Sequence, residues 1–180
     1  MAAQKIGITL DEFVQYALLP ENAERRLEFI DGEIVEMTPG RTWNSGVGHL
    51  LAHKVFGFCE AHNLPCYISG GDGDYAVQEH VVCPDFAYKR TPLSKDYPDR
   101  EPPLWAVEVI SPTDKAPDIR NKRQVYFQAG ILLWEIYPQS QSIDMYAPGQ
   151  PVKTVGIDGT LDGGDVLPGF TLAVRDLFTD

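Results

Sequence analysis

A single acidic residue interrupts a strongly apolar stretch of this sequence. Glu108 lies in AVEVIS, between Val107 and Val109, where the surrounding apolar residues predict a strand of the core. An isolated ionised carboxylate is costly to bury, so such groups are usually paired with a cation, bound to a metal ion or protonated. Glu108 therefore requires a partner, and the identity of that partner indicates the chemistry.

A second carboxylate stands where another strand is predicted to begin. In VVCPDFAYKR, Pro84 cannot donate to a sheet ladder and suits a strand start, which places Asp85 at the beginning of the strand. Two acids on neighbouring strands can share one divalent cation, and hard oxygen ligands suit Mg²⁺ or Mn²⁺ better than zinc. Alternatively, Asp85 caps the turn before its strand, as aspartates often do.

A candidate cation follows on the next predicted helix. Lys122 comes one helical turn after Asp118, so their side chains share a face. If the helix packs over the strand of Glu108, the Lys122 ammonium reaches the same pocket. Alternatively, Lys122 and Asp118 form a surface ion pair worth only about 0.3 to 0.5 kcal/mol. The neighbouring Arg120 and Arg123 are expected on a solvated helix face.

The elements that position these residues are indicated by caps and turn signals. Thr9 is a predicted N-cap of a short first helix, which Pro20 ends. In LEFIDGEIVEM, the Asp31-Gly32 pair between two alternating runs predicts a β-hairpin. Glu28 lies on the first strand of this hairpin, where alternation with apolar neighbours also fits a solvent-facing residue.

Two further helices and several strands are predicted along the rest of the chain. Helical spacing of apolar residues predicts a long helix over 44–62, capped by Asn44 or Ser45, and a second helix over about 118–129, closed by Gly130. Strands are predicted within 66–69, 75–78, 85–89, 104–111, 132–138, 142–148 and 167–178. We therefore predict one domain over residues 1–180, of α/β or α+β type with a mixed sheet.

Composition limits the functional classes. The 180 residues contain no run of 18 apolar residues and no apolar signal segment at the N-terminus, so we expect a cytoplasmic protein without membrane contact. The net charge of −11 argues against binding nucleic acid by bulk electrostatics, although acids around a bound metal ion contribute to this total. The cysteines, Cys59, Cys66 and Cys83, are expected to be small buried residues rather than disulfides or zinc ligands.

Three other motifs are poorer candidates. His49 and His53 stand four residues apart, but no further ligand completes a zinc site. The GGDGD segment lacks the remaining ligands of a calcium loop and is expected to connect two strands. Ser111 has no nucleophile-elbow context, so a serine hydrolase is not expected.

An ordered set of motifs resembles the Uma2 family (DUF820) of PD-(D/E)XK nuclease-like proteins. The set comprises Asp85 in a Pro-Asp pair, Glu108 in VEVIS, D-x-x-x-K across Asp118 and Lys122, and Tyr126 with the following Ala-Gly pair. LEFIDGEIVEM at the beginning and LPGF near the end extend the resemblance over most of the chain. The resemblance implies a restriction-endonuclease-like fold, with a central mixed sheet flanked by helices and an N-terminal helix and hairpin.

The same resemblance implies Mg²⁺- or Mn²⁺-dependent hydrolysis of phosphodiester bonds in DNA by a homodimer. Asp85 and Glu108 would be metal-binding carboxylates, and the carbonyl of Val109 would complete the coordination. The general motif places lysine two residues after the glutamate, where this chain has Ile110; Lys122 on the following helix would take that role. Glu28 would be a fourth catalytic acid.

A protein of a different class is also consistent with the sequence. A catalytically inactive member would keep the nuclease fold as a binding or dimerisation module. The presence of all the matched residues favours an active nuclease, whereas the charge of −11 favours the inactive module.

Overall fold

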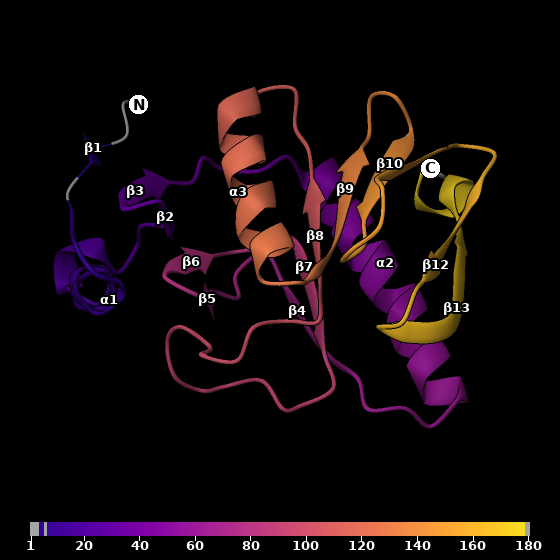
Figure 1. Cartoon of the computed structure of the whole chain (residues 1–180), viewed down its shortest axis with the longest axis horizontal. Helices are drawn as coiled ribbons and strands as arrows, with labels where there is room; N and C mark the ends of the chain where they lie inside the picture. The colour runs from indigo at the N-terminus through magenta and orange to yellow at the C-terminus, as the bar shows by residue number, and fades with distance from the viewer. Residues whose placement is uncertain (1–3, 6, 179–180) are drawn as a thin grey trace.

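A six-stranded mixed sheet forms the centre of the structure (Figure 1). The structure is a computed structural model and describes residues 4–5 and 7–178. The strands of the central sheet follow the order β11-β10-β9-β8-β7-β4. Within this sheet, β8 (Trp105–Val109) and β9 (Leu132–Tyr137) are parallel, whereas the other neighbours are antiparallel. The remaining strands are β4 (Tyr67–Gly70), β7 (Phe86–Lys89), β10 (Ser142–Tyr146) and β11 (Lys153–Gly156).

A second sheet is antiparallel and contains the predicted hairpin. Its order is β1-β3-β2-β6-β5, and Asp31 and Gly32, with φ of 52° and 78°, join β2 to β3. Positive φ at both central residues is the geometry of the tight hairpin turn that Asp-Gly favours. The strand β6 was not predicted, because three residues are too few to show a period. The bounds are β1 (Gln4–Lys5), β2 (Leu27–Ile30), β3 (Glu33–Glu36), β5 (Tyr75–Val77) and β6 (His80–Val82).

The first helix, α1 (Leu10–Ala17), begins as predicted and is followed by a 3₁₀ turn, η1 (Pro20–Asn22). Thr9 caps it: the Thr9 hydroxyl accepts from the backbone of Glu12, whose carboxylate accepts from the Thr9 backbone N–H. This reciprocal pair satisfies two backbone donors that a helix start leaves free.

The two longer helices cover opposite faces of the central sheet (Figure 1). Residues of α2 (Thr42–Ala61) pack in one apolar cluster with one face of β8, and residues of α3 (Ala116–Gln128) pack in another with the opposite face. The predicted caps of α2 were wrong, because the cap position is Arg41 and both Asn44 and Ser45 lie inside the first turn. The end of α3 is as predicted, with Gly130 at a φ of 69° beyond the last turn.

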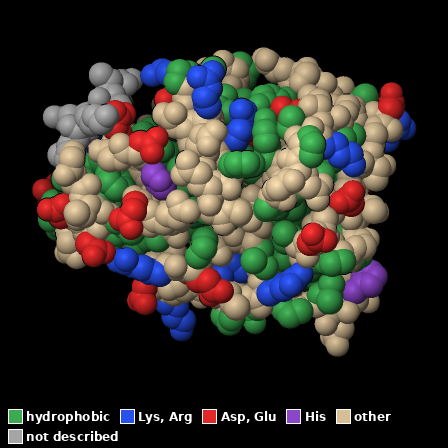
Figure 2. All heavy atoms as spheres, viewed as in Figure 1, with side chains coloured by type: hydrophobic (Ala, Val, Ile, Leu, Met, Phe, Trp, Pro, Cys, Tyr) green, Lys and Arg blue, Asp and Glu red, His purple; other side chains and the backbone are tan. Residues whose placement is uncertain are grey.

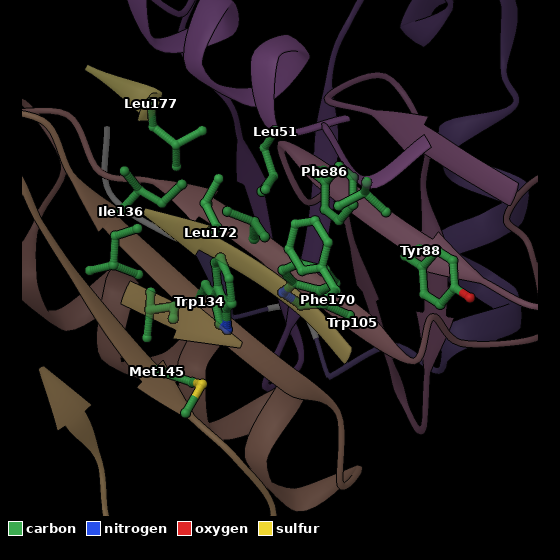
Figure 3. Packing of buried hydrophobic residues seen from close by; sticks show 14 of the residues in the cluster. Leu51, Phe86, Tyr88, Trp105, Trp134, Ile136, Met145, Phe170, Leu172 and Leu177 are labelled. Carbon is green, nitrogen blue, oxygen red and sulfur yellow. The ribbon is translucent and has the colours of Figure 1, made fainter. Parts of the chain in front are cut away.

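The largest core cluster lies between α2, the central sheet and the C-terminal strands (Figure 3). Trp105 and Trp134, on adjacent parallel strands, pack with ring centroids 4.5 Å apart, and Phe170 closes over Trp105. The covering layer consists of β12 (Thr160–Gly163), β13 (Leu167–Ala173) and the 3₁₀ turn η2 (Val174–Leu177). Neither β11 nor β12 was predicted, since each has only four residues; β11 is mostly exposed, whereas β12 alternates exposed and buried residues.

The alternation of β8 explains the position of Glu108. Trp105, Val107 and Val109 face the α2 cluster, whereas Ala106 faces the cluster that contains α3. Successive side chains of a strand point to opposite faces, so Glu108 points to the α3 side together with Ala106. None of the helices in the described part of the chain has the length and apolar character that a membrane span requires.

Candidate active site

A polar cleft of about 1440 Å³ lies between the β2–β3 hairpin, the first turns of α2, the segment after β4, and α3. Its lining includes Glu28, Asp85, Glu108 and Lys122, which come from four separate elements. On the face drawn in Figure 2, basic and acidic side chains are interspersed, and the basic ones form no continuous stripe among the described residues. The feature that sets the cleft apart is the charge cluster inside it.

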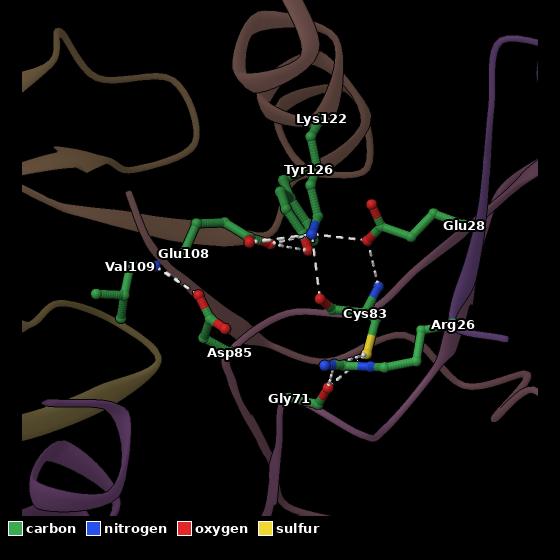
Figure 4. Close-up of polar contacts among 9 residues, drawn as sticks. All are labelled: Arg26, Glu28, Gly71, Cys83, Asp85, Glu108, Val109, Lys122 and Tyr126. Atoms are coloured by element: carbon green, nitrogen blue, oxygen red, sulfur yellow. Dashed lines mark hydrogen bonds and ion pairs between the residues drawn. The ribbon is translucent and has the colours of Figure 1, made fainter. Parts of the chain in front are cut away.

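Lys122 is the cation that accompanies Glu108 (Figure 4). The Lys122 ammonium lies 3.0 Å from Glu108 Oε1 and 3.0 Å from Oε2, and the Tyr126 hydroxyl donates to Oε1 at 2.6 Å. The Glu108 and Lys122 side chains are 14% and 12% exposed, so this pair is largely removed from water. Tyr126 lies one turn after Lys122, so one face of α3 supplies both contacts.

Glu28 shares the same ammonium from the opposite side. Its Oε1 lies 2.7 Å from Lys122 Nζ and accepts the backbone N–H of Cys83 at 2.8 Å. Lys122 also donates to the carbonyl of Cys83 at 3.1 Å. The ammonium is therefore fixed between two carboxylates and one backbone carbonyl, and Glu28 is a buried residue rather than a solvent-facing one.

Asp85 lies beside Glu108 at the end of the β7–β8 ladder. Phe86 pairs with Val107, so continuing the antiparallel register sets Asp85 opposite Glu108, with both side chains on one face. Asp85 Oδ2 accepts the backbone N–H of Val109 at 2.7 Å. The carbonyl of Val109 accepts from the side-chain amide of Asn44 at 3.4 Å. Asn44 thus connects the start of α2 to the end of β8.

Burial and mutual repulsion change the titration of these acids. Burial, with smaller contributions from Asp85 and Glu28, raises the pKa of Glu108 to about 8, although Lys122 and Tyr126 act to lower it. The pKa of Asp85 is also raised, mainly by burial. Asp74, in the segment after β4, has a pKa raised to about 6 by burial and by Glu28. The two carboxylates beside Lys122 outweigh burial and raise the pKa of its ammonium, so Lys122 stays charged.

The donor set fits a hard divalent cation in its chemistry. Asp85 and Glu108 present carboxylate oxygens to the same cleft, and in their deprotonated forms the acids around Lys122 exceed its single positive charge, which a cation would balance. Among residues 4–5 and 7–178, however, no group of three or more acidic, histidine or cysteine side chains is arranged as a ready-made metal site. Asp85 and Glu108 would therefore hold such a cation together with water, as Mg²⁺ sites commonly do.

The structure brings together the residues that the sequence singled out and decides between some of the alternatives. The surface pair of Lys122 with Asp118 is not present, because Lys122 points into the cleft and Asp118 is exposed. The prediction that Arg123 lies on a solvated face was wrong. Arg123 forms a bidentate pair with the buried Glu135, with contacts of 2.8 and 2.6 Å, whereas Arg120 is exposed as expected.

Two residues that contact β8 were not among the predicted site residues. Tyr126 stood in the matched motif without a role, and its hydroxyl donates to Glu108, whereas the Asn44 amide donates to the Val109 carbonyl. The spacing carried a signal for Tyr126, since it follows Lys122 by four residues and shares its helix face. Asn44 carried none, because its place at the site depends on how distant segments pack.

The remaining candidates have ordinary structural roles. His49 lies at the cleft and its Nδ1 is 2.8 Å from the Ser45 carbonyl within its own helix. The GGDGD segment connects β4 to β5, as predicted. All three cysteines are free: Cys59 and Cys83 are buried, as expected, whereas Cys66 is only partly buried.

Comparisons with known proteins agree with this architecture. A model of the family Uma2, described as "Putative restriction endonuclease", matches residues 10–175. No curated protein matches the chain. Among solved structures, a protein described as a "putative nuclease belonging to DUF820", from Anabaena variabilis, is similar with a TM-score of 0.78 and 20% sequence identity. The match covers 95% of this chain and 97% of that one, and it shows a shared fold.

Proposed function

This chain belongs to the Uma2 family, whose members are described as putative restriction endonucleases, and from this membership we propose that it hydrolyses phosphodiester bonds in DNA with a divalent cation, Mg²⁺ or Mn²⁺. The observation that carries the proposal is the position of Glu108. It is a nearly buried acid beside Asp85 in a polar cleft, where a single ammonium serves two carboxylates. Such an excess of buried acid is costly to keep for stability alone.

Each residue has a role in this proposal. Asp85 and Glu108 would hold the cation, and the Val109 carbonyl, which has a second lone pair besides the one that accepts from Asn44, would be a third oxygen donor. When bound, a divalent cation lowers the pKa of a coordinated water and neutralises charge on the phosphate. Lys122 would stabilise the charge that develops on the phosphate oxygens, since its ammonium is fixed in place before the reaction.

Glu28 is assigned a positioning role that differs from direct contact with the substrate. Its Oε1 is already occupied by the Cys83 backbone and by Lys122. Glu28 would hold the Lys122 ammonium in its position beside Glu108, and the Tyr126 hydroxyl would fix the orientation of the Glu108 carboxylate. This arrangement orients the reactive groups without requiring either residue to move a proton.

We further propose that residues 1–180 act as one nuclease domain, in the cytoplasm and as a homodimer. Two sites related by a two-fold axis match the approximate symmetry of a DNA duplex and would cut both strands. Sedimentation equilibrium with and without a short duplex measures this assembly. A monomer under both conditions would contradict the dimer without affecting the chemistry of a single site.

The experiment that tests the activity is cleavage of supercoiled plasmid with Mg²⁺ or Mn²⁺ by wild type and by Glu108→Gln, with EDTA as the metal-free control. We expect cleavage that requires the cation and is lost in Glu108→Gln. The matched control is Asp118→Asn, which removes an exposed carboxylate from the same region and should retain cleavage. Cleavage by Glu108→Gln at the wild-type rate would overturn the assigned role.

A catalytically inactive binding module is the second candidate, and one observation favours it. Both oxygens of Glu108 already accept from Lys122 or Tyr126, so most of the acceptor capacity of this carboxylate is used within the protein. If folded wild type binds DNA but no divalent cation supports cleavage, the binding module becomes the better description.

A further inference from the structure

Trp43 differs from the other tryptophans of the chain in its exposure. Trp105 and Trp134 are fully buried in the core, whereas Trp43 is 46% exposed in the first turn of α2. One face of its indole is stacked on Phe178, with ring centroids 6.1 Å apart and planes 8° from parallel. The indole is therefore held in one orientation while much of its surface stays accessible to solvent.

Trp43 also lines a hollow of about 270 Å³. The walls include the flat or branched apolar side chains of Ile110, Pro112 and Pro138. Polar side chains complete the lining, namely Arg41, Asn44 and Gln139. A small space with apolar walls and a few polar groups is suited to a flat, partly polar ring.

The hollow adjoins the cleft of the proposed active site and shares lining residues with it. Arg41, Asn44 and Ile110 line both. Ile110 is only two residues beyond Glu108, and the Asn44 amide donates to the carbonyl of Val109 between them. A nucleic acid strand whose phosphate lies over Glu108 and Asp85 would therefore bring an adjacent nucleotide to the hollow.

The negative net charge of the protein favours a mode of nucleic acid binding that does not depend on charge. With a net charge of −11, the chain cannot rely on bulk electrostatic attraction to a polyanion. Stacking of a base on an aromatic side chain needs no net charge and tolerates any base, because every base has a π-face. The Arg41 guanidinium at the rim supplies a local positive charge for the adjoining phosphate.

We propose that Trp43 is a stacking platform for a single unstacked nucleobase of the nucleic acid strand that enters the cleft, with Arg41 contacting its phosphate. This inference rests on the proposed function and adds to it a class of substrate, namely nucleic acid with a base that is free to leave its stack. A duplex with an unpaired end or gap, or a single strand, meets this requirement better than a continuous duplex.

A purely structural role for Trp43 makes a different prediction. If the indole only covers Phe178, its replacement lowers thermal stability and leaves nucleic acid binding unchanged. If the indole stacks on a base, Trp43→Phe, which keeps an aromatic face, retains much of the affinity, whereas Trp43→Ala loses it. The two roles are thus separated by affinity in variants whose folding is checked by thermal unfolding.

The exposure pattern supplies a direct optical test. Wild type is mixed with a short oligothymidylate strand in Mg²⁺, and tryptophan fluorescence is recorded by stopped flow before cleavage proceeds. The expected quenching comes from Trp43, because the buried Trp105 and Trp134 are inaccessible to the strand. Affinity is measured in parallel with wild type, Trp43→Ala and Trp43→Phe. The matched control is Phe56→Ala, which changes another exposed aromatic residue of the same helix, on the order of 20 Å from Trp43 along the helix axis.

We expect Trp43→Ala to weaken binding of the single strand about 5- to 150-fold, with Trp43→Phe intermediate and Phe56→Ala unchanged. Metal-dependent plasmid cleavage by wild type without quenching, or with unchanged binding by Trp43→Ala, would overturn this inference and leave the nuclease intact. If wild type neither cleaves plasmid nor binds the strand, the proposed function fails and the platform fails with it. Equal loss of affinity in Phe56→Ala would also overturn it, because the contact would not be local to the hollow.

Discussion

Glu108 and Glu135 occupy paired positions on adjacent parallel strands, and consecutive residues of α3 provide their cations. Glu135 is 1% exposed, and Arg123 binds it through two nitrogens at 2.8 and 2.6 Å. The Tyr137 hydroxyl donates to the same carboxylate at 2.7 Å. Here one anion meets one cation with matched geometry, so the pair is electrically balanced.

The Glu108 region has the same elements but a different balance. Lys122 is a point charge shared between Glu108 and Glu28, and Asp85 adds a third carboxylate nearby. An ammonium lacks the planar fork with which a guanidinium matches a single carboxylate. The comparison teaches that burial of a charged pair alone does not indicate function. Arg123 and Glu135 also line the cleft, so it is the excess of acid over cation that separates the proposed active site from the balanced ion pair between α3 and β9.

The largest expected effect is on activity and concerns the shared cation. Lys122→Met should lower plasmid cleavage by about 100- to 1000-fold, since it removes a charge aligned with the phosphate before the reaction. Arg123→Met, the control at the neighbouring position, should keep its activity per folded molecule. Both rates are normalised to the folded fraction from circular dichroism. Cleavage by Lys122→Met at the wild-type rate would contradict the difference between the two regions.

The next effect is on stability and concerns the balanced pair. Glu135→Gln leaves the Arg123 guanidinium without its counter-ion, which should lower the free energy of unfolding by about 3 kcal/mol, the lower end for a buried pair because Arg123 is partly exposed. Urea unfolding at neutral pH measures this change. The same variant should cleave plasmid normally once folded. A loss of cleavage without a loss of stability would reverse the assignment of the two regions.

The two regions should also differ in their response to pH. Burial raises the pKa of Glu108 from 4.5 to about 8, so between these values the folded protein holds a proton that the unfolded chain releases. The free energy of unfolding should therefore be greatest below the lower value and fall as pH rises towards the upper one. Asp74, raised from 3.8 to about 6, adds a fall in the same direction at lower pH.

Urea unfolding across this range, followed by the fluorescence of the buried tryptophans, measures the slope. We expect the fall above pH 6 to disappear in Glu108→Gln and to persist in Glu135→Gln. Added Mg²⁺ should restore stability at the alkaline end, because a cation binds the deprotonated carboxylates. An unchanged slope in Glu108→Gln would show that another group is responsible.

The smallest effect concerns the hydroxyl groups that hold each glutamate. Tyr126→Phe removes the 2.6 Å hydrogen bond to Glu108, and Tyr137→Phe removes the corresponding bond to Glu135. Each should cost about 1 kcal/mol of stability. Only Tyr126→Phe should also slow cleavage, by about tenfold, because only Glu108 must keep a defined orientation for the reaction. Equal activity in the two variants would mean that Tyr126 has no positioning role.

Local features of the fold were predictable because their causes are local. The capping box at Thr9 and the Asp31-Gly32 turn depend on backbone groups a few residues apart, and both are present. The end of α3 at Gly130 follows from the same kind of rule. The short strands β6, β11 and β12 each pair with a strand next to them in sequence, but they were not predicted because segments of three or four residues are too short to establish a period.

The sequence by itself determined that Glu108 needs a partner, since an acid in an apolar strand cannot stay both buried and alone. It also supplied the candidates, because Asp85, Lys122 and Glu28 stand in an ordered pattern. Only the tertiary structure decided which partner each residue takes. Lys122 pairs with Glu28 and Glu108 rather than with Asp118, and Arg123 pairs with the buried Glu135 rather than lying on a solvated face. Those choices depend on how α3 packs across β8 and β9, and helical spacing alone cannot show which strand a helix face will meet.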